Sequence, residues 1–188
     1  MSEHLTPAEL TLLGLLAEQP RHGYEIERTI EDRGMREWTD LAFSSIYYLL
    51  KKLEKAGLIR PVDGTGQPDG PPRRVYAPTP EGLAAAREGT GAALAAVTPA
   101  HPAVLVGMAN LPLLSPDRAL EALRGRAEEL ARQLQRLRAH PRTRAPAPPF
   151  VAAIFDHALT RLQAELDWTH RTITALEGET DGQDRPES

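Results

Sequence analysis

The segment from Ser44 to Ile59 constrains the fold of this chain more than any other stretch. Its apolar side chains recur at the i, i+3, i+4, i+7 spacing of one buried helix face. They are Ile46, Leu49, Leu50 and Leu53. Serines begin the segment and Gly57 ends it, as helix termini favour. The opposite face carries Ser44, Tyr48, Lys51 and Lys55, with Tyr47 and Lys52 at its edges. Hydroxyl and ammonium groups on an exposed helix face suit a helix in a DNA groove, so we expect a gene regulator.

The charge of the chain is uneven, and its basic part coincides with this helix. The formal net charge is −4 over 188 residues, which by itself does not favour a nucleic acid ligand. Residues 1–43 carry four arginines against nine carboxylates, whereas residues 44–76 carry six Lys and Arg against three carboxylates. Because the Debye length is only about 8–10 Å, local charge matters more than net charge. We therefore expect DNA binding that weakens steeply with salt.

The elements around this helix predict a winged helix-turn-helix. Thr6, Pro7 and Glu9 form the start of a first helix, whose buried face we assign to Leu10, Leu13, Leu16 and Ala17. A second helix follows over 22–33, then a short first strand over 38–41 with Trp38 in the core. Strands at 58–62 and 73–77 flank a turn-rich loop over 63–72, and a further helix begins at Thr79-Pro80.

Several motifs of this region resemble the PadR family of transcriptional regulators over residues 5–86. They are Leu12-Leu13-Gly14-Leu15-Leu16, His22-Gly23-Tyr24-Glu25-Ile26, Ile46-Tyr47, Leu49 to Ile59, and Arg74-Val75-Tyr76 before Thr79-Pro80-Glu81-Gly82. The resemblance implies a homodimeric repressor that responds to a ligand or signal. It also implies that Tyr24, Ser44, Tyr47 and Lys51 face DNA, and that the wing reaches a neighbouring groove or phosphates. Two features depart from the family: Tyr48 stands where proline is common, and the wing loop is long.

The candidate DNA-binding residues follow from the helix face and from this resemblance. They are Tyr24, Ser44, Ser45, Tyr47, Tyr48, Lys51, Lys52, Lys55, Arg73 and Arg74. Alternatives stay open for most of them. The lysines and Tyr47 fit an ordinary solvated helix face, Tyr24 fits the core, and the two arginines fit a soluble strand end.

Two segments of the carboxy-terminal half carry strict heptads, which are typical of helices packed along a narrow seam. The first contains Leu120, Leu123, Ala127, Leu130, Leu134 and Leu137, and the second Phe155, Leu159, Leu162, Leu166, Thr169, Ile173 and Leu176. A proline-rich connector over 141–149 separates them. We expect the large seam residues to form a dimer interface, namely Leu120, Leu123, Leu130, Leu134, Leu137, Phe155, Leu159, Leu162, Leu166 and Ile173. The alternative is that the seams pack within one subunit.

Trp168 lies off the seam and has two interpretations. It either packs one helix against its surroundings or forms a wall of a pocket for a small apolar or aromatic effector.

No pattern indicates catalysis, a cofactor or a metal site. The chain has no cysteine, which removes disulfides and Cys-type zinc sites. The six histidines lack metal-ligand spacing. The glycines at 64, 66 and 70 precede no Gly-Lys-Ser/Thr motif, so they fit turns better than a phosphate loop. Neither a secretory signal nor an apolar run of membrane-spanning length appears, so we expect a cytoplasmic protein without membrane contact.

These observations predict a mainly α-helical chain with a small β wing. We expect a winged helix-turn-helix over 1–88, a helical dimerisation region of antiparallel coiled-coil-like helices over 89–177, and a disordered acidic tail over 178–188. The expected function is sequence-specific binding of double-stranded DNA at a palindromic operator, as a homodimer that represses until an effector or signal intervenes. The alternative is a winged helix that binds another protein, which the acidic first helices keep open. The surface around Lys51, Lys55 and Arg74 discriminates the two, because a negative surface there would favour the protein partner.

Overall fold

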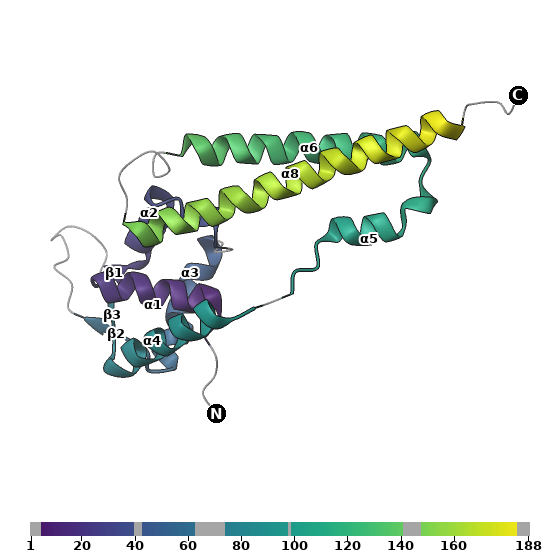
Figure 1. The fold of residues 1–188 in the computed structure, drawn as a ribbon. Helices are drawn as coiled ribbons and strands as arrows, with labels where there is room; N and C mark the ends of the chain where they lie inside the picture. The colour runs from purple at the N-terminus through teal and green to yellow at the C-terminus, as the bar shows by residue number, and fades with distance from the viewer. Residues whose placement is uncertain (1–4, 40–42, 63–73, 98, 141–147, 184–188) are drawn as a thin grey trace, which may run out of the picture. The chain divides into compact units, whose positions relative to one another are not determined.

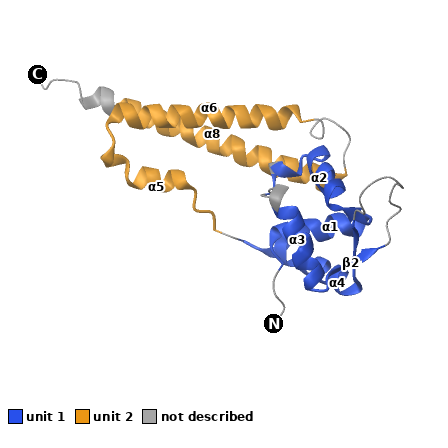
Figure 2. Ribbon diagram, turned by 180° about the vertical axis from the view of Figure 1, so that it is seen from behind, with its two compact units in different colours: residues 1–98 blue, residues 99–188 orange. Residues whose placement is uncertain are grey.

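The computed structural model describes residues 5–39, 43–62, 74–97, 99–140 and 148–183. The chain forms two compact units, residues 1–98 and 99–188 (Figure 2). The division falls later than the boundary expected at residue 88. The reason is that helix α4 (Pro80–Ala95), which extends past residue 88, contacts α1 (Pro7–Glu18) of the first unit.

The first unit has the element order of a winged helix-turn-helix (Figure 1). After α1 come β1 (Arg21–His22), α2 (Gly23–Asp32), a 3-10 turn (Met35–Glu37), α3 (Phe43–Lys55), β2 (Ile59–Val62), β3 (Val75–Pro78) and α4. The three strands form an antiparallel sheet in the order β1-β3-β2. The expected fold is confirmed.

The core of this unit joins the three helices of the motif to the sheet. Its buried side chains are Leu12, Leu13, Leu15, Leu16, Ile26, Ile30, Met35, Ile46, Leu49, Leu50, Leu53, Ile59 and Tyr76. The apolar face expected for α3 is therefore confirmed. The face expected for α1 is partly wrong, because Leu10 is half-buried and Ala17 exposed. Since α1 contacts α3, α4 and β3, it buries a broader stripe than one apolar row, including Leu12 and Leu15.

The first strand was expected in the wrong place. Trp38 ends the 3-10 turn and is 41 % exposed, so it belongs neither to a strand nor to the core. Thr39 is likewise outside any strand, and residues 40–41 lie outside the described ranges. The strand that completes the sheet is β1 (Arg21–His22), in which Arg21 pairs with Tyr76 and His22 with Val75 of β3. A strand of two residues has no alternation to reveal it, because its only support is the distant strand β3.

The two ends of the wing motif contact each other. Gly57 has the left-handed φ of +72° that ends α3, and the Leu58 N–H donates to the carbonyl of Leu53. The carbonyls of Gly57 and Leu58 then accept hydrogen bonds from the Thr79 hydroxyl and N–H, at 2.8 and 3.0 Å. A Cβ on Gly82 would lie 1.9 Å from the Leu58 oxygen. The Gly57-Leu58 and Thr79-Pro80-Glu81-Gly82 motifs therefore pack directly against each other.

The second unit contains a long antiparallel helix pair, α6 (Pro116–Ala139) and α8 (Pro149–Gln183) (Figure 1). Arg124 pairs with Glu177 and Arg138 with Gln163, which fixes the antiparallel register. The heptad residues of the two helices form one shared core: Leu120, Leu123, Ala127, Leu130, Leu134, Leu137, Phe155, Leu162, Leu166 and Ile173 are buried, with Leu159 and Leu176 at its margin. Within one chain, each seam therefore already faces the other. This is the packing that the alternative anticipated, and a role of these residues in a dimer remains a prediction.

The rest of the second unit differs from expectation at both ends. A short helix α5 (Ala103–Ala109) and a 3-10 turn (Leu111–Leu113) precede α6. At the other end α8 runs to Gln183, so the stretch 178–183 is helical and not a frayed tail. Helix propagation from a packed segment is favourable, and no proline interrupts it before Pro186. Residues 184–188 lie outside the described ranges. In the described part of the chain, no helix has both the length and the apolarity to cross a bilayer.

Candidate nucleic-acid interface

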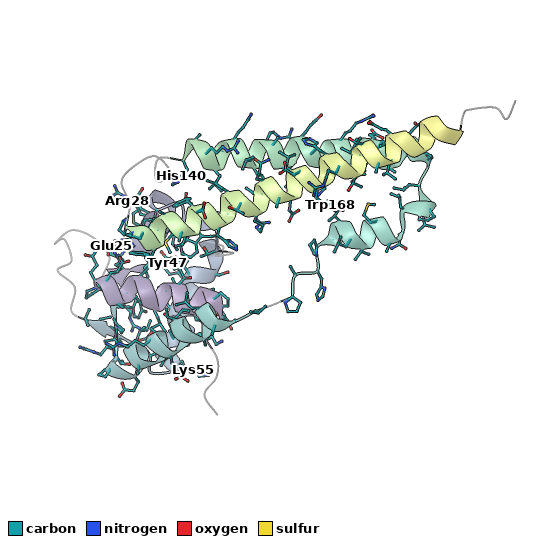
Figure 3. All side chains as sticks on the ribbon, in the orientation of Figure 1. Glu25, Arg28, Tyr47, Lys55, His140 and Trp168 are labelled. Carbon is teal, nitrogen blue, oxygen red and sulfur yellow. The ribbon has the colours of Figure 1, made fainter. Side chains whose placement is uncertain are left out.

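The outward face of α3 presents the polar side chains that the sequence assigned to it. Tyr47 is 50 % and Tyr48 67 % exposed, and Lys51 and Lys55 are exposed beyond them. Figure 3 shows Tyr47 and Lys55 toward opposite ends of this helix. Ser45 is half-buried, and the side chain of Ser44 lies outside what the structure describes. The helix therefore exposes a hydroxyl- and ammonium-bearing row along its length.

The three lysines of α3 differ in their partners. Among the described residues, neither Lys51 nor Lys55 forms an ion pair with a carboxylate. The ammonium of Lys52 lies 2.7 Å from Oε1 of Glu9, whose side chain is only 5 % exposed. Two of the three ammonium groups thus remain available to an anionic ligand, whereas the third contacts the body of the unit.

A hollow of about 460 Å³ opens where the start of α2 and the middle of α3 meet β3 and the residue before it. Its lining consists of His22, Gly23, Tyr24, Tyr47, Leu50, Lys51, Arg74 and Tyr76. Tyr24 is 56 % exposed, so it is not a core residue. Its ring stacks on that of His22 with a centroid distance of 6.3 Å. The hollow brings together four of the sequence-predicted residues, from three separate elements: Tyr24, Tyr47, Lys51 and Arg74.

The start of α2 explains the spacing of the His-Gly-Tyr motif. His22 caps the helix, since its Nδ1 accepts the N–H of Glu25 at 3.2 Å and the Glu25 carboxylate accepts the N–H of His22 at 3.0 Å. A Cβ on Gly23 would lie 2.7 Å from Cε1 of Tyr47. The glycine therefore leaves room for the Tyr47 ring, and the motif positions Tyr24 beside it. The sequence showed the motif but not this contact, because the two residues belong to different helices.

Arg74 lies at the edge of the hollow and is linked to α3 through Glu54. Its guanidinium is 3.4 Å from Oε1 of Glu54 and its side chain is 70 % exposed. The hydroxyl of Tyr76 donates to Oε2 of the same carboxylate at 3.4 Å. Glu54 thus connects α3 to the wing strand and leaves Arg74 accessible. Arg73 and the wing loop over 63–72 lie outside the described residues.

The first unit is similar in sequence to a known family of proteins. Residues 12–88 match the family model of the transcriptional regulator PadR-like family. These residues belong to the PadR-like family of transcriptional regulators. No curated protein matches the chain significantly.

Solved structures share the fold of most of this chain, beyond the residues that match the PadR-like family model. Bacillus subtilis PadR in complex with operator DNA aligns with a TM-score of 0.72 at 19 % identity, over 89 % of this chain and 98 % of that one. The same protein in complex with p-coumaric acid aligns with a TM-score of 0.70 at 20 % identity, over 90 % and 98 %. A PadR-like regulator from Bacillus cereus gives 0.68 at 19 % identity, over 92 % and 99 %. The similarity extends to the helical carboxy-terminal unit.

An ion network around the Glu18 carboxylate in the PadR-like domain links α2 to α1, and the sequence did not reveal it. Arg21, 4 % exposed, donates to the Leu15 carbonyl and to Glu18. Arg33 binds the same carboxylate through two hydrogen bonds of 2.6 and 2.7 Å. These contacts hold the pKa of Glu18 below its usual value, the hydrogen bonds from Arg33 contributing most, against a smaller opposing effect of burial. The helix that carries Tyr24 is therefore held at both ends.

Among the residues that the structure describes, no group of three or more His, Asp and Glu side chains is placed so that it could hold a metal ion. In the second unit, Trp168 is half-buried on α8, on the side that faces away from α6 in Figure 3.

Proposed function

We propose that this protein binds a palindromic DNA operator as a homodimer, represses transcription there by excluding competitors from the promoter, and releases the DNA in response to an effector or signal. The observation that carries the proposal is the outward face of α3. Its exposed row of Tyr47, Tyr48, Lys51 and Lys55 lies opposite a buried apolar stripe, and two of its lysines have no carboxylate partner among the described residues. A solved structure of the same fold contains operator DNA.

In this proposal α3 lies in the major groove, and the hollow beside it receives the sugar-phosphate backbone. Tyr24, Lys51 and Arg74 line the hollow from three elements, and hydroxyl, ammonium and guanidinium groups are the usual donors to phosphate oxygens. Tyr48 and Lys55 lie further along the outward face of the helix. Contacts of this kind orient the protein on the duplex, and base contacts from α3 supply the specificity.

The second unit supplies candidate dimer surface. No residue of α5 is buried, and Leu105, Val106, Leu113 and Leu114 are all more than half exposed. A run of exposed large apolar side chains marks an interaction surface more often than a solvated one. A dimer that binds successive major grooves on one side of B-DNA holds its recognition helices roughly 34–36 Å apart.

The proposed effector is a small aromatic compound, with Trp168 as one wall of its site. A similar structure contains p-coumaric acid, and a half-buried indole stacks well on a flat ring. The test uses a Trp38→Phe variant, in which Trp168 is the only indole. Its fluorescence should be quenched by aromatic acids at concentrations that also release DNA. Quenching without release would show binding without regulation.

The direct test of DNA binding begins with selection of bound duplexes from a random pool by the full-length protein. The selected duplex is then titrated at several salt concentrations with the wild type, Lys51→Met and Arg87→Met. We expect Lys51→Met to weaken binding roughly tenfold, as loss of a charged hydrogen bond would. Arg87→Met removes an equal charge from α4 and should bind as the wild type does. Failure to enrich any sequence, with capture of a protein partner instead, would favour the protein-binding alternative.

A further inference from the structure

Lys52 contacts the interior of the first unit, although it stands next to Lys51 in the sequence. Its Nζ lies 2.7 Å from Oε1 of Glu9, and that carboxylate side chain is 5 % exposed. The other oxygen of Glu9 accepts hydrogen bonds from the N–H and the hydroxyl of Thr6, at 2.8 and 2.9 Å. One buried carboxylate therefore joins the start of α1 to the last turn of α3.

The pairing constrains what Lys52 can do. A carboxylate at this depth is stable as an anion only when donors surround it. Burial raises the pKa of Glu9, but the hydrogen bonds from Lys52 and Thr6 outweigh it, so the pKa lies below its usual value. Moving the Lys52 ammonium to a DNA phosphate would leave Glu9 with the Thr6 donors alone. Lys51 and Lys55 carry no such cost, because neither pairs with a described carboxylate.

We propose that Lys52 is a positioning residue and not a DNA contact. The Glu9–Lys52 pair fixes the rotation of α3 about its own axis against α1, and this rotation directs Tyr47 and Lys51 outward. Successive residues of a helix differ by about 100° around its axis, so a residue adjacent to Lys51 is well placed for such a link. The inference rests on the proposed function, in which α3 is the helix that binds DNA.

The salt dependence of DNA affinity separates the two roles of a lysine. Removing a phosphate contact lowers the slope of log affinity against log salt by about one. A positioning residue leaves that slope unchanged. The experiment compares Lys51→Met, Lys52→Met and the double variant Glu9→Gln/Lys52→Met on one selected duplex, with thermal unfolding of each protein. The double variant removes both charges of the pair and keeps an acceptor for Thr6.

We expect Lys51→Met to bind DNA more weakly and with a smaller salt dependence, with little change in melting temperature. Lys52→Met should lower both the melting temperature and the DNA affinity and leave the salt dependence unchanged. The double variant should regain most of the lost melting temperature and affinity. A slope for Lys52→Met as low as that of Lys51→Met, persisting in the double variant, would overturn the inference. If the wild type binds no duplex, the proposed function fails instead. Thermal unfolding then tests the structural role of the Glu9–Lys52 pair. A melting temperature of the double variant above that of Lys52→Met supports this role, and a lower one overturns it.

Discussion

At the scale of single residues, the outward face of α3 depends on groups that are not themselves exposed on it. Gly23 leaves the space that the Tyr47 ring occupies. Glu9 holds Lys52, and Glu54 holds Arg74. Gly23 and Glu54 each contact a candidate DNA-binding residue of another element, and Glu9 contacts the positioning residue Lys52 from α1. Substitutions beneath the surface should therefore alter binding without removing any candidate contact.

Gly23→Ala should weaken DNA binding with little effect on stability. The added Cβ would lie 2.7 Å from Cε1 of Tyr47. The Tyr47 ring can move away at a small cost in stability, but its hydroxyl group then moves away from the position in which it would contact DNA. The matched control is Gly14→Ala in α1, where a Cβ meets nothing within 4 Å. The control should bind DNA normally and be more stable by roughly 0.5–1 kcal/mol. Unchanged DNA affinity of Gly23→Ala would show that the position of the Tyr47 ring is unimportant.

Acid should destabilise the first unit through Glu9 and Glu18. The pKa of each lies below the ordinary value of 4.5. Their contribution to stability is therefore complete above about pH 4.5, and it is lost as the pH falls through the lower folded-state pKa. Denaturant unfolding from pH 6 to pH 3 should show this loss, and Glu18→Gln should flatten the curve in that window. Glu88→Gln, at an exposed position of α4, should keep the wild-type slope. If the free energy of unfolding of Glu18→Gln fell as steeply toward pH 3 as that of the wild type, protonation of Glu18 would not be a cause of the acid destabilisation.

At the scale of elements, local signals were sufficient for α3 and insufficient for its partners. The apolar spacing and the terminal glycine lie within the helix itself, so the sequence predicted both its buried face and its end at Gly57. The strand Arg21–His22 and the wide buried stripe of α1 depend on β3 and α4, which are distant in the chain. The heptads of α6 and α8 predicted a seam correctly, but a periodic pattern does not say whether the facing helix belongs to the same chain.

The close contact between α4 and the end of α3 makes Gly82 sensitive to substitution. Gly82→Ala would place a Cβ 1.9 Å from the Leu58 carbonyl oxygen, and backbone must move to accept it. We expect a loss of stability at or above the upper end of the roughly 1–3 kcal/mol typical of overpacking. Gly91→Ala in the same helix meets nothing within 4 Å and should not destabilise. Thermal unfolding of both variants tests the contact, and equal melting temperatures would refute it.

The seam between α6 and α8 should dominate the stability of the second unit. Leu137 is 1 % exposed within it, whereas Leu113, outside the helix pair, is 82 % exposed. Leu137→Ala should cost about 2–5 kcal/mol, as buried leucines do, and Leu113→Ala should cost little in a monomer. Denaturant unfolding followed by circular dichroism measures both. A small effect of Leu137→Ala would mean that the intrachain seam is not the stabilising contact.

At the scale of the whole molecule, binding of a palindromic operator requires two copies of the chain to act together. The α6–α8 seam is satisfied within one chain. In the described part of the second unit, the exposed large apolar side chains are Phe150 at the start of α8 and a group of four in and after α5, namely Leu105, Val106, Leu113 and Leu114. This moves the expected dimer contact from the heptad leucines toward residues 103–114. Both arrangements keep one winged domain on each subunit.

Light scattering should therefore detect a dimer that charged substitutions in α5 dissociate. Leu105→Glu/Val106→Glu places carboxylates on side chains that are 53 % and 64 % exposed, so the fold of one subunit should tolerate them. We expect a monomer with weakened operator binding. Leu94→Glu, at a position 84 % exposed in α4, should remain dimeric. If the double variant stays dimeric, the dimer interface lies on a surface other than α5.

Photo-crosslinking from α3 shows whether its outward face contacts DNA. Tyr48 is 67 % exposed on the outward face, so Tyr48→p-azidophenylalanine should preserve the fold and bring the reactive group to the DNA. Leu94→p-azidophenylalanine is the control on α4. On a selected duplex, we expect covalent protein–DNA adducts from position 48, mapped to bases or sugars at the major groove, and none from position 94. Undiminished binding without any adduct from position 48 would show that α3 does not lie in the major groove.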